Sequence, residues 1–345
     1  MKMRRMGNTG VMVSELCLGA MNFGQPDWGV DEKTSLDVIQ AFIEAGGNFI
    51  DTADVYTGGV SETICGKALS GRRDSIVLAT KGHFPVTTRF GEAPAHANAL
   101  GSSRRHLTLA LEESLRRLKT DYIDLYQVHC WDSVTPIQET LATLDGFVKS
   151  GKVRYVGLSN FEAWQIAEAR QFCIRFNWEP LITAQMQYSL VCRDIERGVV
   201  PVCSRYGIGI LPWSPLGGGV LTGKYQRDLT GPGGTRFGAT PDDANVWRKQ
   251  FVNGRNLDIA DAVRAMAKQC ESTSTAVAIA WVLGRPMVSS VIIGPKTVAQ
   301  LKDNLAACDL RMTQEQIKRL DEVSTPMPTY PETFIQRMKR NMPEA

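Results

Sequence analysis

Short apolar segments alternate with longer segments of helical periodicity along most of this chain of 345 residues. The short segments are apolar without strict alternation, which is typical of strands buried on both faces of a parallel sheet. Successive strand–helix units of this kind predict an α/β protein, and eight of them predict a (β/α)8 TIM barrel. The strands are expected at Leu16–Gly19, Asn48–Asp51, Ile76–Thr80, Ile123–Val128, Tyr155–Ser159, Ile182–Met186, Gly209–Pro212 and Ser290–Ile293.

Two of the intervening helices carry clear signals in the sequence. Leucines from Leu107 to Leu118 recur on one helical stripe, after a serine at 102 or 103 that suits the N-cap position. A second helix is expected to begin at Thr135–Gln138, where capping-box spacing coincides with proline at the first helical position. This second helix should end before Gly151.

Segments outside the strand–helix alternation are expected at the two ends of the barrel. The turn residues Asn8-Thr9-Gly10 predict an N-terminal β-hairpin that plugs one barrel end. Residues Gln226–Asn253 and the tail after Thr325 are rich in loop-forming residues, and we expect them to cover the mouth of the active site. Residues 1–345 are expected to form a single domain.

The composition narrows the class of partner. Lysine and arginine total 39 against 36 aspartate and glutamate residues, and this near balance disfavours nucleic-acid or membrane-surface binding. The N-terminal segment has no apolar run of the length of a signal peptide or membrane span, so we expect a cytoplasmic protein. The 8 cysteines and 4 histidines form no metal-ligand pattern, so no metal site is expected. The expected partner is a small molecule.

Polar side chains stand at the ends of three predicted strands. Asp51 ends the second strand, Lys81 follows the third and His129 follows the fourth, while Tyr56 lies in the loop after Asp51. All four should converge on one mouth of a barrel. A buried charge at such a position is costly unless it has a partner or a task, so the four residues together indicate a catalytic site.

This set of residues suits carbonyl reduction, in which the developing alkoxide needs a proton. Tyr56 can deliver that proton, but the ordinary pKa of tyrosine is about 10, so a cation that stabilises the phenolate helps. Lys81 is that cation, Asp51 is placed to keep it protonated, and His129 could orient the carbonyl oxygen. The alternative is a barrel lyase with Lys81 as Schiff-base nucleophile, although the neighbouring Asp51 disfavours the neutral amine that this requires.

Three motifs make the chain similar to the aldo-keto reductase superfamily over nearly its whole length. The segments NFIDTADVYTGGVSE, LATKG and LYQVHCWD resemble those that carry the catalytic residues of that family. The resemblance implies that Asp51, Tyr56, Lys81 and His129 are the catalytic tetrad. It implies an NADP(H)-dependent oxidoreductase that reduces an aldehyde or ketone to an alcohol by hydride transfer, with tyrosine as general acid. The superfamily also contains channel-associated nicotinamide-binding regulators, but these have asparagine where this chain has His129.

The cofactor site is expected at strand ends, because no GxGxxG follows a strand and a Rossmann site is unsupported. The segment GGVLTGK resembles a P-loop, but Tyr225 stands where a magnesium-binding Ser or Thr is required. Its glycines still allow backbone N–H groups to approach a pyrophosphate. The family resemblance implies nicotinamide contacts from GLSN, AQMQYS and the Trp213 segment. Lys224 and Arg236 are expected to add positive charge along the phosphates. The residues expected to bind the cofactor in this part of the chain are Met21, Asp51, Ser159, Asn160, Gln185, Trp213, Ser214, Leu216, Gly218 and Lys224.

The segment IIGPKTVAQLKDN resembles the family's adenosine-phosphate segment. Lys296 precedes a helix in which Thr297 and Gln300 have capping-box spacing, so a cation and a helix N-terminus should face one anion, which favours the 2′-phosphate of NADPH. Gln300 and Asn304 should contact adenine. Basic residues of the better-known animal members correspond to Gly294 and Gln300 here, so NADH is the alternative cofactor.

Aromatic residues near the expected mouth predict a partly apolar substrate pocket. The candidates are Phe23, Trp28, Phe84 and Trp131, with Tyr330 and Phe334 contributed by the tail. Ketones, aldehydes, sugars and polyketides all remain open as substrates.

Overall fold

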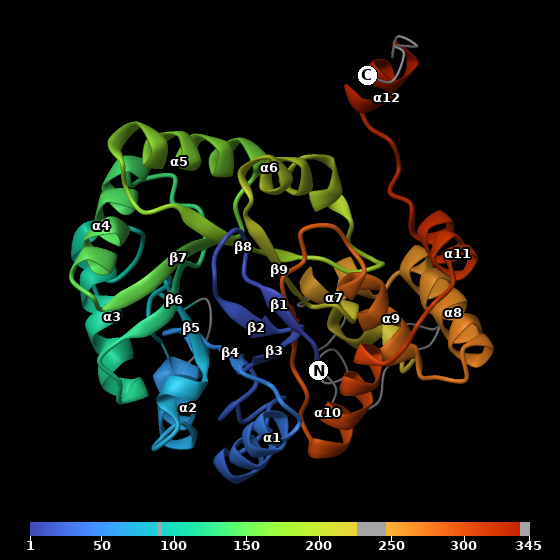
Figure 1. Cartoon of the computed structure of the whole chain (residues 1–345), viewed down its shortest axis with the longest axis horizontal. Helices are drawn as coiled ribbons and strands as arrows, with labels where there is room; N and C mark the ends of the chain where they lie inside the picture. The colour runs from blue at the N-terminus through green and yellow to red at the C-terminus, as the bar shows by residue number, and fades with distance from the viewer. Residues whose placement is uncertain (88–91, 226–245, 339–345) are drawn as a thin grey trace.

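The computed structural model describes residues 1–87, 92–225 and 246–338. Eight parallel strands form a nearly closed barrel in the order β10-β3-β4-β5-β6-β7-β8-β9, with helices around it (Figure 1). The predicted (β/α)8 barrel is therefore confirmed. The strands are β3 (Leu16–Gly19), β4 (Phe49–Asp51), β5 (Val77–Gly82), β6 (Ile123–Val128), β7 (Val153–Ser159), β8 (Leu181–Gln187), β9 (Gly209–Trp213) and β10 (Val291–Ile293).

The barrel closes between its last two strands through the residues that precede β10. The Ile210 backbone N–H donates to the carbonyl oxygen of Met287 at 2.7 Å, and the Ser289 N–H donates to that of Ile210 at 3.0 Å. All eight expected strands are present, and their observed bounds differ from the predicted ones by at most two residues at either end. Their continuous apolar character, rather than their exact ends, was the reliable signal.

Helices cover the outer face of the barrel, and the core lies mainly between them and the strands. The leucine stripe from Leu107 to Leu118 is buried against the sheet, and Ser103 caps its helix by accepting from the His106 N–H at 3.3 Å. The helices are α1 (Glu32–Glu44), α2 (Val60–Ala68), α3 (Arg104–Leu118), α4 (Ile137–Lys149), α5 (Ala163–Phe176), α6 (Val199–Tyr206), α7 (Val246–Phe251), α8 (Gly254–Gln269), α9 (Ser274–Leu283), α10 (Val298–Leu305), α11 (Gln314–Ser324) and α12 (Glu332–Arg337). Short 3-10 turns are η1 (Tyr56–Gly59), η2 (Arg73–Ser75), η3 (Asp194–Arg197), η4 (Gly217–Thr222) and η5 (Ala306–Cys308).

The predicted start of α4 is wrong by one residue. Pro136 occupies the N-cap position, without a side-chain cap, and the helix begins at Ile137. The Thr135 hydroxyl donates instead to Asp132 Oδ2 at 2.6 Å. The same carboxylate accepts hydrogen bonds from the backbone N–H groups of Ser102 and Val134. Because the Thr135 hydroxyl is bonded to Asp132, it does not cap the helix.

The N-terminal hairpin closes the amino end of the barrel, as predicted. Strand β1 (Met3–Arg5) pairs antiparallel with β2 (Met12–Ser14). Met6 and Val13 are fully buried, and they pack in an apolar cluster inside the barrel that includes Phe49, Leu125 and Leu211. This layer excludes water from the barrel interior below the polar strand ends.

The long segments do not follow the sequence prediction. Within Gln226–Asn253, residues 226–245 lie outside the described residues, and the following residues form α7, a helix where a loop was expected. The described part of the tail after Thr325 extends beyond the side of the barrel and includes α12 (Figure 1). Tyr330 is 83% exposed and Phe334 is 54% exposed, so the expectation that these described tail residues cover the mouth is wrong. The tail is held beside η3, where Arg197 donates to the carbonyl oxygen of Met327.

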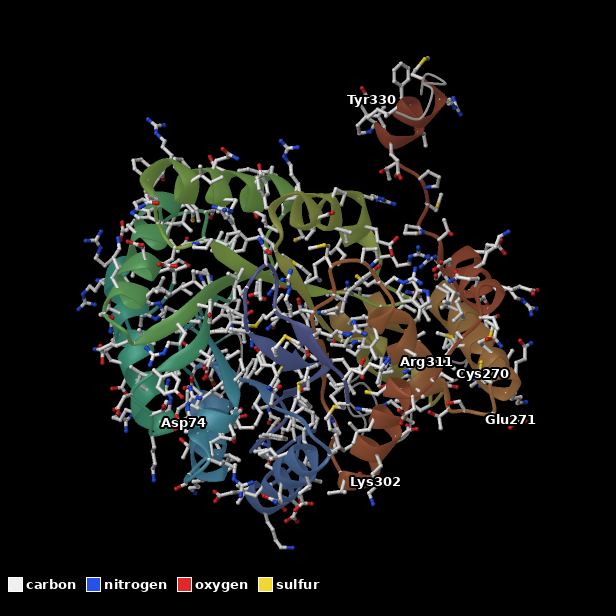
Figure 2. All side chains as sticks on the ribbon, viewed as in Figure 1. Asp74, Cys270, Glu271, Lys302, Arg311 and Tyr330 are labelled. Carbon is white, nitrogen blue, oxygen red and sulfur yellow. The ribbon has the colours of Figure 1, made fainter. Side chains whose placement is uncertain are left out.

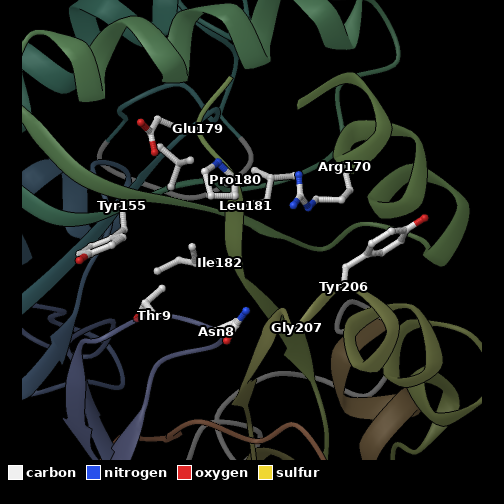
Figure 3. A pocket seen from close by; sticks show the side chains of 11 residues that line it. Asn8, Thr9, Tyr155, Arg170, Glu179, Pro180, Leu181, Ile182, Tyr206 and Gly207 are labelled. Atoms are coloured by element: carbon white, nitrogen blue, oxygen red, sulfur yellow. The ribbon is translucent and has the colours of Figure 1, made fainter. Parts of the chain in front are cut away.

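A polar cleft lies at the amino end of the barrel, beside the hairpin turn (Figure 3). Its walls include Asn8 and Thr9 from the turn, Tyr155 from the start of β7, and Arg170 and Glu179 from the α5 region. The strand ends that carry the candidate catalytic residues lie at the opposite end. Among the described residues, no helix has both the length and the apolar character needed to cross a bilayer.

Gly157 shows how tightly the barrel interior is packed. A Cβ at this position would lie 2.1 Å from Thr183 Oγ1 and 3.1 Å from the Thr183 carbonyl oxygen. We predict that Gly157→Ala lowers the free energy of unfolding by about 1 to 3 kcal/mol, because the clash includes backbone. Gly146→Ala is the matched control: its Cβ would meet nothing within 4 Å on α4, and alanine there should stabilise by about 0.5 to 1 kcal/mol. Urea denaturation measures both changes, and equal effects would contradict the assignment of the clash.

Candidate active site

The parallel register brings the strand-end residues together. Asp51 is the last residue of β4 and lies opposite Ala79 on β5, so Lys81 follows two residues further along the same face. Tyr56 begins η1, the next element after β4, and His129 directly follows β6. All four predicted catalytic residues are therefore gathered at the carboxyl end of the barrel, where sites occur in this architecture.

The Lys81 ammonium is the centre of this group. Its Nζ atom donates to Asp51 Oδ1 at 2.6 Å, to the Thr52 carbonyl oxygen at 2.7 Å and to the Tyr56 hydroxyl at 3.2 Å. These three acceptors use all three N–H donors of an ammonium group. The Lys81 side chain is 0% exposed and that of Asp51 is 3% exposed, so the pair is an ion pair removed from water.

The protonation state of Lys81 follows from two opposing effects. Burial acts to lower the pKa of Lys81, but the charges of Asp51 and then Tyr56 outweigh it and raise the pKa to about 12. The ammonium form therefore persists at neutral pH, beside the phenol oxygen.

Two glutamines complete the setting of Asp51. Its second carboxylate oxygen, Oδ2, accepts from Gln127 Nε2 at 3.1 Å and from Gln185 Nε2 at 2.9 Å. Gln185 was expected at the site, whereas Gln127 and the Thr52 carbonyl were not. Gln127 could have been found from its position two residues before His129 on β6, which places both on one face of the strand.

His129 lies between two aromatic rings and is held through its backbone. Its ring centroid is 5.7 Å from that of Tyr56 and 4.9 Å from that of Phe84, with edge-to-face geometry in both pairs. Burial, followed by the nearby Lys81 charge, lowers the pKa of His129 well below its ordinary value. The imidazole is therefore neutral at neutral pH and can both donate and accept a hydrogen bond.

Part of the expected cofactor set adjoins the tetrad. The Asn160 side-chain amide donates to the His129 carbonyl oxygen at 2.9 Å and to Ser159 Oγ at 3.1 Å. Ser159 Oγ in turn donates to the Gln185 carbonyl oxygen at 3.0 Å. Asn160 has a φ of +58°, a conformation that asparagine tolerates better than most residues. The ends of β7 and β8 therefore form one hydrogen-bonded unit with His129.

A second group of expected cofactor residues follows β9. Ser214, Gly217, Gly218 and Gly219 all have positive φ values, between 54° and 96°. The side chain of Lys224 folds back over this loop, since its Nζ lies 2.5 Å from the position of a Gly219 Cβ. An ammonium group above glycine-rich backbone suits a phosphate group, so the residues present fit a pyrophosphate. Trp213 and Leu216, at the two sides of Ser214, are partly exposed, and Arg236 lies outside the described residues.

The third group lies at the end of β10 and the start of α10. Thr297 caps α10 by accepting from the Gln300 N–H at 3.1 Å, while Gln300 Oε1 accepts the Lys296 N–H at 2.8 Å. This differs from the expected capping box, because Gln300 reaches Lys296 rather than the cap residue itself. Gly294 is exposed and Asn304 is 5% exposed. Asn22, which follows Met21, joins this segment to the end of β3 by donating to the Pro295 carbonyl oxygen at 3.0 Å.

The expected substrate aromatics divide into two sets. Phe23 is fully buried in the core between sheet and helices, so its expected contact with substrate is not supported. Trp28, Phe84 and Trp131 are partly exposed. Within the described ranges, no group of three or more histidine, cysteine, aspartate or glutamate side chains is arranged to hold a metal ion.

Comparison with known proteins identifies the class to which this barrel and site belong. The model of the Aldo/keto reductase family matches residues 15–325, so the chain belongs to this family. It is an oxidoreductase, and enzymes of this family generally use nicotinamide cofactors.

Three similar proteins are named as oxidoreductases, reductases or dehydrogenases. An uncharacterized oxidoreductase of Bacillus subtilis is 37% identical, over 92% of this chain and 94% of the relative. A norsolorinic acid reductase of Aspergillus flavus is 36% identical, over 97% of this chain and 85% of the relative. A putative aryl-alcohol dehydrogenase of Schizosaccharomyces pombe is 34% identical, over 94% of this chain and 95% of the relative. Carbonyl reduction in the general sense is the activity that these relatives support.

A second buried carboxyl group lies just behind the tetrad. Asp54 is 0% exposed, and neither of its carboxyl oxygens has a hydrogen-bond partner among the described residues. The neighbouring Glu62 is also fully buried, but it accepts from Arg117 Nε and from Thr80 Oγ1, both at 2.6 Å. Burial, followed by the charge of Glu62, raises the pKa of Asp54 well above its ordinary value.

The raised pKa of Asp54 predicts a pH-dependent stability. The folded protein holds a proton at Asp54 that the unfolded chain loses above about pH 4, so this group makes stability fall as pH rises from there. Asp54→Asn should remove this loss and raise the free energy of unfolding at pH 7 by at least about 1 kcal/mol. Thermal unfolding between pH 5 and pH 8 measures the difference. The exposed Asp37→Asn on α1 should not change the slope, and a destabilised Asp54→Asn variant would show that the carboxylate is charged and needed.

Proposed function

We propose that this enzyme reduces an aldehyde or ketone to the alcohol with NADPH, and that Tyr56 is the general acid. The observation that carries the proposal is the Lys81 ammonium, which is fully buried and hydrogen-bonded at once to Asp51 and to the Tyr56 hydroxyl. A buried cation at the phenol oxygen stabilises the phenolate that remains after proton transfer. Asp51 offsets the cost of burying this cation.

His129 is proposed to orient the carbonyl oxygen. As a neutral imidazole it can donate a hydrogen bond without competing with Tyr56 for the role of acid. Its ring meets that of Tyr56 edge to face, with the ring centroids 5.7 Å apart. The carbonyl oxygen would then lie between the Tyr56 hydroxyl and the imidazole.

The nicotinamide cofactor, when bound, supplies a hydride to the carbonyl carbon. Ser159, Asn160 and Gln185 would hold the carboxamide, because their polar groups adjoin Asp51 and His129. Trp213 offers a ring for stacking at the end of β9, and Ser214, Leu216, Gly218 and Lys224 would hold the pyrophosphate. Met21, Gly294, Lys296, Gln300 and Asn304 would bind the adenosine part, with Lys296 at the 2′-phosphate.

The two alternative functions are less well supported. A Schiff-base lyase needs a neutral Lys81, whereas the surroundings of Lys81 raise its pKa to about 12. A purely regulatory nicotinamide-binding protein would need no assembled proton donor, yet the Lys81–Tyr56 bond of 3.2 Å is present. Both observations favour the reductase.

Tyr56→Phe tests the proton donor. We predict a loss of turnover on the order of a hundredfold or more, as for removal of a general acid, with nearly unchanged NADPH affinity. Absorbance of NADPH with a panel of carbonyl compounds measures turnover, and cofactor titration measures affinity. Tyr155→Phe is the control, because Tyr155 lies beside the cleft at the amino end of the barrel (Figure 3). A Tyr56→Phe variant with wild-type turnover would exclude Tyr56 as the acid. A borohydride-stable substrate adduct on Lys81, with turnover in the absence of NADPH, would favour the lyase.

Lys296→Ala tests the choice of cofactor. We predict that it weakens NADPH binding by about 1 to 3 kcal/mol and NADH binding far less, because only NADPH has the 2′-phosphate. Lys302→Ala, on the outer side of α10, is the control (Figure 2). Isothermal titration with both cofactors gives the comparison. Equal weakening of NADPH and NADH would remove Lys296 from the 2′-phosphate and make NADH the better candidate.

A further inference from the structure

The His129 imidazole lacks a hydrogen bond that would fix its orientation. Its Nδ1 atom is buried and has no hydrogen-bond partner among the described residues. A histidine that takes part in chemistry is ordinarily oriented by a hydrogen bond of its second ring nitrogen. The backbone of His129 is fixed, since its N–H donates to the Gly82 carbonyl oxygen at 3.1 Å and its carbonyl oxygen accepts from Asn160. The ring itself must therefore be oriented by packing.

Two aromatic rings supply this packing. Tyr56 and Phe84 both meet the imidazole edge to face, with centroid distances of 5.7 and 4.9 Å and interplanar angles of 80° and 69°. Tyr56 is bonded to Lys81, so the buried ion pair sets its position. Phe84 comes from the loop after β5. The orientation of the imidazole therefore depends on the position of Phe84 as well as on that of Tyr56.

Phe84 packs against its neighbour His83, which is held at both its side chain and its backbone. The two rings meet edge to face at a centroid distance of 4.8 Å. The His83 side chain is buried, and its Nδ1 atom forms a hydrogen bond of 2.9 Å with the Ser102 hydroxyl. The His83 carbonyl oxygen accepts from the Gly101 N–H at 2.8 Å. The two ends of the loop after β5 are therefore hydrogen-bonded to each other.

Asp132 attaches this closed loop end to the loop after β6. Its Oδ2 atom accepts from the Ser102 N–H at 2.7 Å and from the Thr135 hydroxyl at 2.6 Å. Burial acts to raise the pKa of Asp132, but its hydrogen bonds, that from Thr135 first, outweigh burial and lower the pKa to about 2. The carboxylate is therefore charged at neutral pH, and its hydrogen bonds are charge-assisted. We refer to His83, Ser102 and Asp132 as the loop anchor.

The backbone at Gly101 leaves the loop anchor little room to shift. Gly101 has a φ of +91°, in the region that favours glycine, and a Cβ there would lie 2.7 Å from Asp132 Oδ2. The Gly101 carbonyl oxygen accepts from His106 Nδ1 at 2.7 Å, and the Ser102 carbonyl oxygen accepts from the Thr140 hydroxyl at 2.9 Å. The end of the loop after β5 is thus fixed to the first turns of α3 and α4.

We propose that Phe84 is a positioning residue for His129, and that the loop anchor holds Phe84 in place through the His83 ring. This proposal rests on the proposed role of His129 in carbonyl reduction. The imidazole would present Nε2 to the carbonyl oxygen, because Nδ1 is the buried nitrogen. A hydrogen bond to this oxygen strengthens as negative charge develops on it in the transition state. Misorientation of the ring should therefore lower kcat and leave KM nearly unchanged.

Phe84→Leu tests the packing on His129. We expect kcat to fall about three- to tenfold, as for loss of an aromatic pair, with KM and NADPH affinity within about twofold of the native values. The fall should be equal for propanal and benzaldehyde, because it acts through His129 rather than through contact with the substrate. Phe84→Tyr should keep at least about half of the native kcat, since it retains the ring. A rise in KM confined to benzaldehyde, with unchanged kcat, would make Phe84 a substrate contact and overturn the proposal.

Ser102→Ala tests the loop anchor. Ser102 is 1% exposed, and alanine removes only the hydroxyl that bonds to His83. We expect kcat to fall about two- to fivefold with nearly unchanged KM, as for loss of one hydrogen bond. The double variant Ser102→Ala/Phe84→Leu should be no slower than Phe84→Leu, because both changes act on one ring. Unchanged kcat in Ser102→Ala, or effects that multiply in the double variant, would overturn the role of the anchor.

Ser290→Ala is the matched control. Ser290 is 0% exposed, and its hydroxyl donates to the Ser14 carbonyl oxygen at 2.8 Å, just before β10 at the amino end of the barrel. Alanine there also removes one buried hydrogen bond, so it should lower stability. It should leave kcat unchanged, and an equal fall in kcat would show that the effect of Ser102→Ala is only a general loss of stability.

NMR of the resting enzyme distinguishes failure of this proposal from failure of the proposed function. Side-chain 15N–1H spectra of protein with labelled histidine report on the His129 ring without turnover, and His129→Asn assigns its signal among the 4 histidines. We expect this signal to shift or broaden in Phe84→Leu and Ser102→Ala, but not in Ser290→Ala. Such a change supports the positioning role even if no aldehyde is reduced, and absent turnover would then count against the reductase alone. An unchanged His129 signal in both variants would contradict the positioning role and leave the Tyr56 test of the reductase untouched.

Discussion

The buried ion pair between Lys81 and Asp51 is the constraint on which the candidate site depends. An ammonium group with 0% exposure is costly unless an opposite charge and hydrogen bonds replace the water that it loses. Asp51, the Thr52 carbonyl and the Tyr56 hydroxyl supply three acceptors within 3.2 Å. These acceptors come from one strand end and the turn after it, so β4 and β5 must pair in this register for the charge to be tolerated.

The same pair connects the chemistry to the rest of the barrel. Gln127 on β6 and Gln185 on β8 both donate to Oδ2 of Asp51, and Lys81 on β5 donates to Oδ1. Asp51 therefore has hydrogen-bond partners on three other strands. Below this polar layer, the apolar interior is closed by Met6 and Val13 of the hairpin. The low-dielectric surroundings strengthen each of these interactions, and they also make any displaced group expensive. A fixed position for the Tyr56 hydroxyl and a rigid barrel are thus two consequences of one arrangement.

The two ends of the barrel are built for different tasks. The amino end is closed by backbone hydrogen bonds and apolar packing, and the polar cleft beside the hairpin carries none of the proposed catalytic groups. The carboxyl end gathers loops with strained or left-handed residues such as Asn160 and Ser214, which the surrounding contacts must hold in place. The Phe84 ring, from the loop after β5, adds an apolar surface against His129. The closed amino end therefore gives a rigid base for the loops at the carboxyl end of the barrel.

The sequence by itself determined the barrel and the hairpin, because both depend on local patterns of apolar strand segments and turn residues. It also predicted that Asp51, Tyr56, Lys81 and His129 lie together, and the structure gathers them at the carboxyl end of the barrel. Their catalytic role is proposed from the family resemblance and from this geometry. The sequence could not locate Gln127 or the Thr52 carbonyl, since their roles arise from distances across strands that lie apart in the chain. The start of α4 and the path of the tail were also decided by tertiary structure. Asp132 competes for Thr135 through a contact that capping rules do not include, and the tail beyond Thr325 follows contacts with η3 rather than its own composition. Phe23 shows the same limit, because an aromatic residue expected at the mouth from its place in the sequence can be buried in the core, and only packing decides which.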